Sequence, residues 1–397
     1  MGDFFQKLAN WLESQDIECI KINFNAGDRY FYKKSLKTFD YKGCLAEFPD
    51  WLECFLVKHG IDAIVCFGDC RAYHRQAKEL AREYGINFFA FEEGYIRPNY
   101  ITFEQEGVNF FSQFVSHLSH QNINKKVHRK EIYDVQNNQT KLMKSIVLYY
   151  LVWVLFSFQF PNYQHHRGIR PFKELGCWAL STLRRYKNKF IETKCFNRFI
   201  AGYSKQYFVF ALQVHNDFQI RVHSDLQAME KYIALVLEDF SQNADKSTHL
   251  VLKHHPMDRG YRNYRNLITK LAKQLNIENR VHYYCDIHLP TLLKHSLGLV
   301  TVNSTTGIQA LFHKIPVKVL GRAIYNLPRL TSQYELGRFW LNPGSVDYEY
   351  FSFYREELIA YSQLNGGFYG ISPWMDEYQK VDSVVESLDA SVELLKP

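Results

Sequence analysis

The sequence lacks the features that mark several large classes of protein. Its eight cysteines include no CxxC pair and most lie in apolar runs, which indicates reduced packing residues rather than disulfides or a zinc site. The N-terminus has no basic start followed by an apolar stretch, so no secretory signal is predicted and we expect the chain in the cytoplasm.

The apolar run at residues 146–158 is too short to cross a bilayer, because a spanning helix needs about 20 such residues. A buried core helix is one interpretation. The stretch that follows, 164–198, is rich in bases, and an aromatic, basic region also suits docking on an anionic membrane face. The bases of this stretch are Arg167, Arg170, Lys173, Arg184, Arg185, Lys187, Lys189, Lys194 and Arg198. Both interpretations, a buried core helix and a membrane-docking region, stay open.

The length of 397 residues predicts two domains, and a hydrophobic fraction of 46% is that of a folded protein. The formal charge is modestly basic, at 48 − 41 = +7. This balance favours an anionic partner without choosing among nucleotides, nucleic acid and a lipid surface.

Strand-like and helix-like segments alternate in both halves of the chain, which predicts parallel βαβ units. We therefore expect two Rossmann-type domains joined by a helical, aromatic and basic connector. The expected strands are 18–24, 62–67, 87–91, 207–213, 249–253, 280–284, 297–302 and 316–320. The expected domains are 1–110 and 201–345, with the connector at 111–200 and C-terminal helices at 346–397.

Ligands of such sheets bind at the carboxyl ends of the strands. In the first half, Glu92-Glu93-Gly94 follows the strand at 87–91. Two adjacent carboxylates there favour an acid and base pair, with Gly94 allowing a sharp turn. Arg97 can pair with a carboxylate or bind an anionic substrate group. An exposed acidic turn explains the same residues.

In the second half, His255-Pro256 follows the strand at 249–253, and such a histidine can donate to a phosphate or leaving-group oxygen. The alternative is a histidine in a loop whose hydrogen bonds are all made within the protein, without a ligand. Neither this histidine nor its neighbours have metal-ligand spacing, so no metal is predicted.

The residues Ser304-Thr305-Thr306 open a helix, either as simple caps or as a phosphate site. No Walker lysine follows and no GxGxxG precedes, which argues against a kinase-like or dinucleotide-binding fold.

In this order, the three motifs are typical of bacterial transferases that use CMP-activated acidic sugars. The blocks that surround these motifs are NFNAGDRYFY (23–32), CFGDCRAYHRQA (66–77), FEEGYIRPNYIT (91–102), LQVHNDFQI (212–220), KHHPMDRGYRNY (253–264) and VNSTTGIQALFHKIPVKVLGRAIYNLP (302–328). Over about residues 20–330 they resemble capsule polysaccharide β-Kdo transferases of the KpsS/LipB type.

The resemblance implies a GT-B-like architecture, with two Rossmann-type domains facing a cleft. It implies transfer of Kdo from CMP-β-Kdo to phosphatidylglycerol with retention and without a metal or other cofactor. This step starts the poly-Kdo linker of a capsule, which a KpsC-type partner extends within a capsule export complex. The resemblance thus implies a peripheral protein on the cytoplasmic face of the inner membrane.

Carried onto this chain, the resemblance implies that Glu93, or its neighbour Glu92, is the nucleophile. It implies that His255 contacts the CMP phosphate beside Pro256, with Ser304, Thr305 and Thr306 holding that phosphate. Candidates for the Kdo carboxylate or the acceptor headgroup are Arg97, Asp69, Arg71 and His74.

Other functions stay open. One is a different CMP-sugar transferase, such as a sialyltransferase, or a UDP-sugar 2-epimerase. Another is a non-catalytic component of a capsule assembly or export complex. Nucleic-acid binding ranks last, because no recognised module accompanies the bases.

Overall fold

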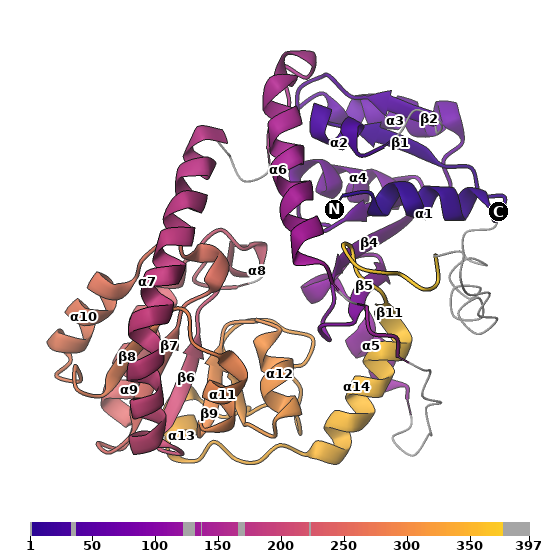
Figure 1. Ribbon diagram of the computed structural model, residues 1–397. Helices are drawn as coiled ribbons and strands as arrows, with labels where there is room; N and C mark the ends of the chain where they lie inside the picture. The colour runs from indigo at the N-terminus through magenta and orange to yellow at the C-terminus, as the bar shows by residue number, and fades with distance from the viewer. Residues whose placement is uncertain are drawn as a thin grey trace. The chain divides into compact units, whose positions relative to one another are not determined.

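The chain folds into two α/β units, each built around sheets of its own (Figure 1). The predicted α/β class with parallel sheets is confirmed. The structure is a computed structural model. It describes residues 2–32, 37–121, 132–135, 137–165, 171–221 and 224–375. The predicted helical tail beyond residue 375 and three bases of the connector (Arg167, Arg170 and the side chain of Lys173) lie outside the described residues and side chains.

The first unit contains most of the chain before Pro171 and takes back residues from Glu356 on. Its elements are α1 (Phe4–Glu13), β1 (Ile20–Asn23), α2 (Ala26–Tyr30), β2 (Lys37–Asp40), α3 (Phe48–His59), β3 (Ala63–Phe67), α4 (Ala72–Glu83), β4 (Asn87–Glu93), β5 (Tyr100–Gln105), η1 (Asn109–Phe111), α5 (Phe114–Ser119), α6 (Gln139–Leu155), η2 (Ser157–Gln159) and β11 (Gln363–Asn365).

The main sheet of this unit has the order β11-β5-β4-β3 and is of mixed direction. Strands β3 and β4 are parallel and joined through α4, as predicted. Strand β5, which the sequence analysis missed, is antiparallel to β4, because a link of only six residues cannot return the chain for parallel pairing. A separate parallel pair, β1 and β2, forms within the chain's first 40 residues.

Hydrophobic clusters cover both faces of the main sheet. Phe4 and Leu8 of α1 pack with Phe91 and Ile101 on one face. Their spacing of four residues puts them on one side of the helix. Phe88 and Ala90 belong to a different cluster with Ala81 of α4. Because side chains alternate along a strand, neighbouring residues of β4 belong to opposite faces.

The second unit contains α7 (Pro171–Tyr203), β6 (Tyr207–Ala211), α8 (Phe218–Arg221), α9 (Met229–Asn243), β7 (His249–Lys253), η3 (Pro256–Asp258), α10 (Arg265–Gln274), β8 (Val281–Tyr284), α11 (Leu289–Lys294), β9 (Gly298–Thr301), α12 (Thr306–Phe312), β10 (Val317–Val319) and α13 (Leu336–Leu341). A last helix, α14 (Tyr348–Ser362), begins in this unit and ends in the first.

The sheet of the second unit is parallel throughout, with the order β10-β9-β6-β7-β8. Counted along the chain this is 5-4-1-2-3, the strand order of a Rossmann sheet. Residues of β6, β7 and β9 are buried at every position, as expected for strands covered on both faces. The order reverses between β6 and β9, and that reversal is where such sheets bind ligands.

The structure divides the aromatic, basic stretch between the two units. The apolar run at 146–158 forms most of α6 and η2, in the first unit, while the bases from Arg184 onward lie on α7, in the second. Trp153 is the only residue of α6 that is buried. Among the described residues, no helix combines the length and the hydropathy that crossing a membrane requires.

Candidate functional site

The loop after β3 is fixed by hydrogen bonds and an ion pair with other residues of the first unit. Gly68 donates its backbone N–H to Phe91 O at 2.8 Å and has a φ of 69°. The carboxylate of Asp69 is almost fully buried, accepts the N–H of Val108 at 3.4 Å and lies 3.6 Å from Lys78 Nζ. Asp69 therefore ties the loop to the following segments.

Two basic residues follow this loop. The guanidinium carbon of Arg71 lies 5.1 Å from the centroid of the Phe67 ring. His74 donates Nδ1–H to Gly68 O at 2.7 Å. Burial, and then the charge of Arg71, lower the pKa of His74 to about 3. His74 is therefore neutral near neutral pH.

Glu92 and Glu93 are the last two residues of β4 rather than part of a turn. Their pairing with Thr102 and Ile101 of β5 extends the strand beyond the predicted end at residue 91. Glu92 Oε1 accepts the N–H of Glu93 at 3.0 Å, and its Oε2 lies over Gly68, 3.4 Å from where a Cβ would stand. Glu92 thus shares the face of the Asp69 loop.

Glu93 lies on the opposite face and is exposed. Burial, and then the charge of Glu93, raise the pKa of Tyr369 to about 12. The two carboxylates thus have different neighbours, although they are adjacent in the sequence.

Gly94 is required by close approach rather than by its dihedral angles. A Cβ there would stand 2.1 Å from Tyr100 O. The exposed side chain of Arg97 donates Nε–H to Gly94 O at 3.1 Å. Glu93 and Arg97 therefore flank Gly94, and both reach solvent.

One carboxylate of the first unit was missed in the sequence. Glu104 on β5 pairs with Ala90, so it lies on the same face as Glu92. It is 3% exposed, and neither carboxylate oxygen has a hydrogen-bond partner among the described residues. The hydroxyls of Ser112, Tyr95 and Ser362 lie near it, outside hydrogen-bonding geometry, and burial raises its pKa to about 7. The alternation in YITFEQ was the signal that could have revealed β5 and this residue.

In the second unit, a buried amide pair joins the ends of β6 and β9. Gln213 Nε2 donates to Asn303 Oδ1 at 2.9 Å, and Asn303 N donates to Gln213 Oε1 at 3.2 Å. This pair fixes the two loops at the point where the strand order reverses. It was not predicted, because nothing in the sequence shows that residues 90 positions apart meet.

Two histidines follow β7, and only the second is accessible. His254 is buried, its Nδ1 lies 2.9 Å from the hydroxyl of Tyr283, and burial lowers its pKa to about 4. His255 is half-buried and accepts the N–H of Met257 on Nδ1 at 3.2 Å. In the neutral ring the proton is then on Nε2.

The hydroxyl-rich segment follows β9, and helix α12 begins at Thr306. Ser304 Oγ accepts the N–H of Thr306 at 3.2 Å and donates to Thr306 Oγ1 at 3.0 Å. The Thr305 side chain makes no capping hydrogen bond. The predicted groups of this unit thus come from β7 and β9, with β6 between them in the sheet.

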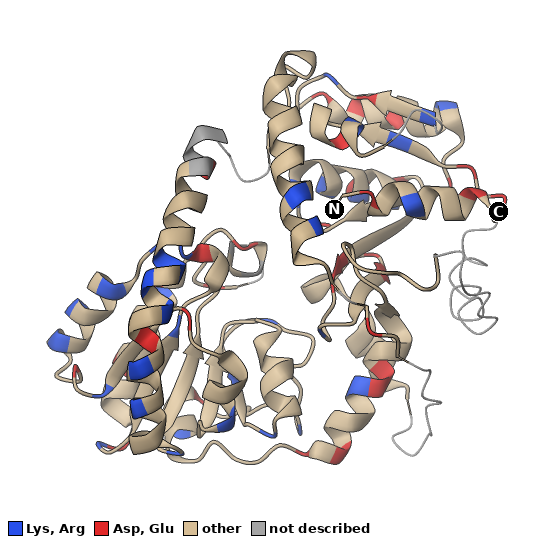
Figure 2. Cartoon of the chain, viewed as in Figure 1, with Lys and Arg blue, Asp and Glu red and all other residues tan. Residues whose placement is uncertain are grey.

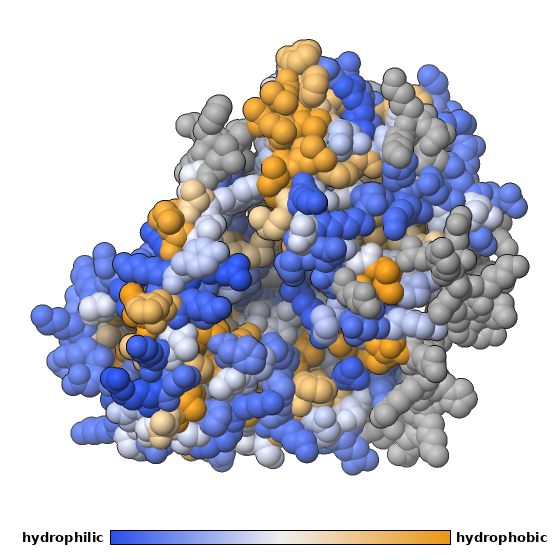
Figure 3. All heavy atoms as spheres, viewed as in Figure 1, coloured by the Kyte–Doolittle hydropathy of each residue, from blue (hydrophilic) through white to orange (hydrophobic). Residues whose placement is uncertain are grey.

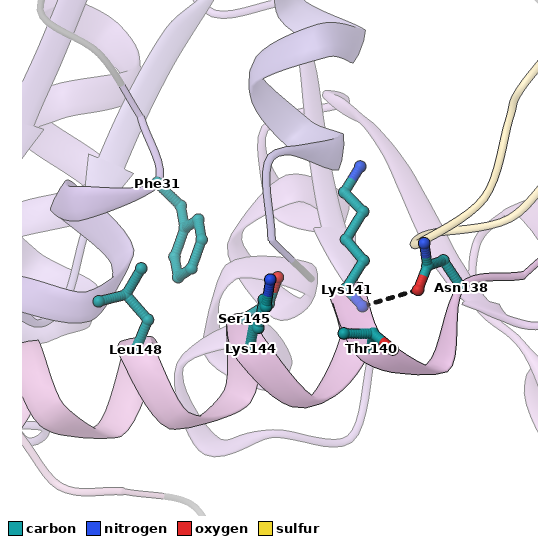
Figure 4. A pocket seen from close by; sticks show the side chains of 7 residues that line it. All are labelled: Phe31, Asn138, Thr140, Lys141, Lys144, Ser145 and Leu148. Atoms are coloured by element: carbon teal, nitrogen blue, oxygen red, sulfur yellow. Dashed lines mark hydrogen bonds between the residues drawn. The ribbon is translucent and has the colours of Figure 1, made fainter.

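A cavity of about 360 Å³ lies in the first unit, and none of these residues is among those that line it. Phe31 and the first turns of α6 line it, and Lys141 N donates to Asn138 Oδ1 at its edge (Figure 4). Lys141 Nζ also lies 3.1 Å from Asp3. Among the described residues, no three His, Cys, Asp or Glu side chains are grouped so as to hold a metal ion.

Comparison with known sequences decides the family. The model of a family described as "Capsule polysaccharide biosynthesis protein" matches residues 62–369. The chain belongs to this family. It is 39% identical over 372 residues to the capsule polysaccharide export protein KpsS of Escherichia coli, covering 93% of this chain and 95% of that one.

A second relative is the capsule polysaccharide modification protein LipB of Neisseria meningitidis serogroup B, 39% identical over 381 residues, with 93% of this chain and 90% of that one covered. Among solved structures, the chain is similar to KpsC of Thermosulfurimonas dismutans, a beta Kdo 2,7 transferase. That similarity has a TM-score of 0.43 at 14% identity and covers 96% of this chain and 100% of that one.

Proposed function

We propose that this chain is a retaining glycosyltransferase that moves Kdo from CMP-β-Kdo to phosphatidylglycerol and so starts the poly-Kdo linker of a capsular polysaccharide. Membership of the capsule family supports a role in capsule synthesis. The observation that carries the proposal is the chemistry at the strand ends. Carboxylates end β4 in the first unit, and imidazole and hydroxyl groups follow β7 and β9 in the second.

Retention through two displacements needs a carboxylate nucleophile at the anomeric carbon. We assign this role to Glu93, because its carboxylate is exposed while that of Glu92 is turned toward Gly68. Arg97 suits the Kdo carboxylate, since a guanidinium pairs with a carboxylate in two hydrogen bonds and its side chain is exposed beside Gly94. Asp69, Arg71 and His74 remain candidates for the acceptor headgroup.

In the second unit, His255 donates Nε2–H to the phosphate of the leaving CMP, and Pro256 restricts the backbone beside it. The hydroxyls of Ser304, Thr305 and Thr306 supply further donors to the same phosphate. Hydrogen bonds that strengthen as the phosphate gains charge lower the barrier to its departure. The proposal includes no metal and no other cofactor.

A lipid acceptor requires contact with a membrane, so we place the protein on the cytoplasmic face of the inner membrane. Two helices support this. The outer side of α6 exposes Met143, Val147, Leu151 and Leu155 at a spacing of four residues, and hydrophobic atoms gather over this helix in Figure 3. The outer side of α7 exposes Leu183, Tyr186 and Phe190 among lysines and arginines (Figure 2).

Apolar side chains flanked by bases suit an anionic bilayer surface. Extension by a KpsC-type transferase in an export complex completes the proposal.

Purified protein incubated with CMP-Kdo and phosphatidylglycerol tests the function, with mass spectrometry of the lipid product. We expect a product heavier by one Kdo. Conversion of CMP-sialic acid alone would indicate a different CMP-sugar transferase. A Glu93→Gln protein that folds and still restores capsule in cells would indicate a non-catalytic component.

A further inference from the structure

The turn η3 holds two imidazoles, and only one of them was singled out from the sequence. His255 precedes the turn and accepts its Met257 N–H on Nδ1. His215 follows β6, and its Nδ1 lies 2.5 Å from Oδ1 of Asp258, the last residue of the turn. Because a carboxylate only accepts, Nδ1 of His215 carries a proton, whereas Nδ1 of His255, which accepts an N–H, does not.

Asp258 is buried and takes part in several hydrogen bonds. Its side chain is 0% exposed, and its Oδ2 accepts the N–H of His215 at 3.3 Å and the hydroxyl of Tyr264 at 3.4 Å. Burying a carboxylate destabilises the folded state unless the carboxylate is paired with a cation and hydrogen-bonded. The protonated form of His215, whose side chain is 21% exposed, supplies that cation.

Two other bases beside the turn, Lys253 and Arg259, are bonded within the protein. Lys253 Nζ donates to His254 O at 2.9 Å and to Cys285 O at 2.6 Å. Arg259 Nε donates to Asp286 Oδ2 at 2.9 Å. Neither of these two bases is therefore available to an anion that arrives at this edge.

His215 has a defined set of charged and titratable neighbours. Besides Asp258 and Tyr264, the ring of Tyr261 lies 5.8 Å from the His215 ring, and the Tyr261 hydroxyl is bonded to Glu174 of α7. Asp217 follows on its own loop. No hydrogen bond to Nε2 of His215 is formed within the described residues.

His215 also lies close in sequence to the point where sheets of this kind bind ligands. It comes two residues after Gln213, whose amide is bonded to Asn303 at the reversal between β6 and β9. Ligands of Rossmann sheets bind outside the strand ends at this point.

Building on the function proposed above, we infer that His215, whose ring Asp258 holds through Nδ1, is a phosphate-binding residue of the nucleotide site. When Nε2 also carries a proton, it donates to an anionic phosphate oxygen, beside the hydrogen bond from Nε2–H of His255. The second unit thereby gains a cationic contact for the phosphodiester of the donor nucleotide.

Calorimetric titration of the full chain between pH 5.5 and 8.5 tests this. The probe is the methyl phosphodiester of cytidine 5′-phosphate, because a phosphate monoester itself titrates near pH 6. Cytidine serves as the uncharged control. We expect the affinity for the diester to fall about tenfold or more as the pH rises across this range, because only a protonated Nε2 can donate to the phosphate, with the affinity for cytidine unchanged.

His215→Asn is the matched variant, since its amide N–H can replace Nδ1–H toward Asp258 while Nε2 is lost. We expect it to bind the diester about 10-fold to 100-fold more weakly at pH 6 and without the pH dependence. His255→Gln should weaken binding at every pH and keep the dependence. His215→Gln provides a second variant if the first is unstable.

The outcomes separate the two proposals. Diester binding that is independent of pH and unchanged in a folded His215 variant would overturn the role of His215 while leaving the nucleotide site intact. If the wild-type chain bound neither cytidine nor its diester at any pH, both the inference and the proposed donor site would fall.

Discussion

The carboxyl ends of the two sheets differ in direction, in charge and in how they are held. In the main sheet of the first unit only β3 and β4 are parallel, so few strand ends meet at one edge, and the chain turns back at once into β5. In the second unit five parallel strands end at one edge. The first edge bears carboxylates and the second bears imidazoles and hydroxyls.

This difference follows from the length of the connections. A link of six residues after β4 forces antiparallel pairing and places Glu92 and Glu93 inside a ladder, where alternation sends them to opposite faces. Each strand of the second unit is followed by a helical connection, which leaves its end in a loop where polar side chains can gather. The carboxylates therefore lie on a strand that continues into a hairpin, whereas the hydrogen-bond donors of the second unit lie in loops between strands and helices.

The largest expected effect distinguishes the two faces of β4. Glu93→Gln should lower the rate of Kdo transfer about 10³-fold or more, because an amide cannot form the glycosyl-enzyme ester. Glu92→Gln should cost much less, since its carboxylate accepts a backbone N–H that an amide oxygen also accepts. Initial rates at matched melting temperatures measure both. The reverse order of effects would make Glu92 the nucleophile.

The next largest effect is a loss of stability, expected where a glycine lies against a backbone carbonyl in each unit. Gly94→Ala places a Cβ 2.1 Å from Tyr100 O, and Gly260→Ala places one 2.1 Å from Cys177 O. Each should lower the free energy of unfolding by about 3 kcal/mol or more, as overpacking that moves backbone does. Urea denaturation measures it. Gly176→Ala in α7, with nothing within 4 Å of its Cβ, is the control and should stabilise the helix by up to about 1 kcal/mol.

A pH effect is expected in the first unit because of Glu104. Its pKa is 4.5 in an unperturbed chain and about 7 in the folded protein, so the folded state retains the proton between these values. Stability should therefore fall as the pH rises from 4.5 to 7 and stay low above 7, by on the order of 3 kcal/mol.

Glu104→Gln should remove this loss, so that the variant gains stability relative to the wild type at pH 8 but not at pH 4.5. Urea midpoints at the two pH values measure the difference. Glu79→Gln, at an exposed position of α4, is the control. Equal pH dependence in wild type and Glu104→Gln would refute the assignment.

The smallest effect compares two helix starts. Asn138 caps α6 by accepting the N–H of Lys141 at 3.0 Å, so Asn138→Ala should cost about 1 kcal/mol of stability. Thr305→Ala should cost little, because the Thr305 side chain makes no cap at α12. Thermal denaturation compares the two. A larger loss at Thr305 would show that its hydroxyl stabilises the fold rather than serving a ligand.

Much of the fold was predictable because local pattern decides it. The strand at 249–253 was predicted at the bounds that the structure shows, since an apolar run with flanking polar residues marks it. Strands β2, β5 and β11 were missed. The last has three residues and pairs with β5, more than 250 positions away, so no local signal announces it.

The candidate residues were found because each follows an apolar strand. The helix start at Ser304-Thr305 was predicted within one residue of where α12 begins. His215 and Glu104 were not singled out, because their importance depends on Asp258 and Ala90, which lie 43 and 14 positions away.

The sequence by itself determined the α/β class, the polar residues that follow each apolar strand, and the resemblance to capsule β-Kdo transferases. Only the tertiary structure decided which face of β4 each glutamate occupies, which imidazole tautomers η3 holds, and how the aromatic and basic stretch is divided between α6 and α7. Local periodicity fixes secondary structure over a few residues. Pairing register, burial and the partner of a charged side chain depend on segments brought together by the whole fold.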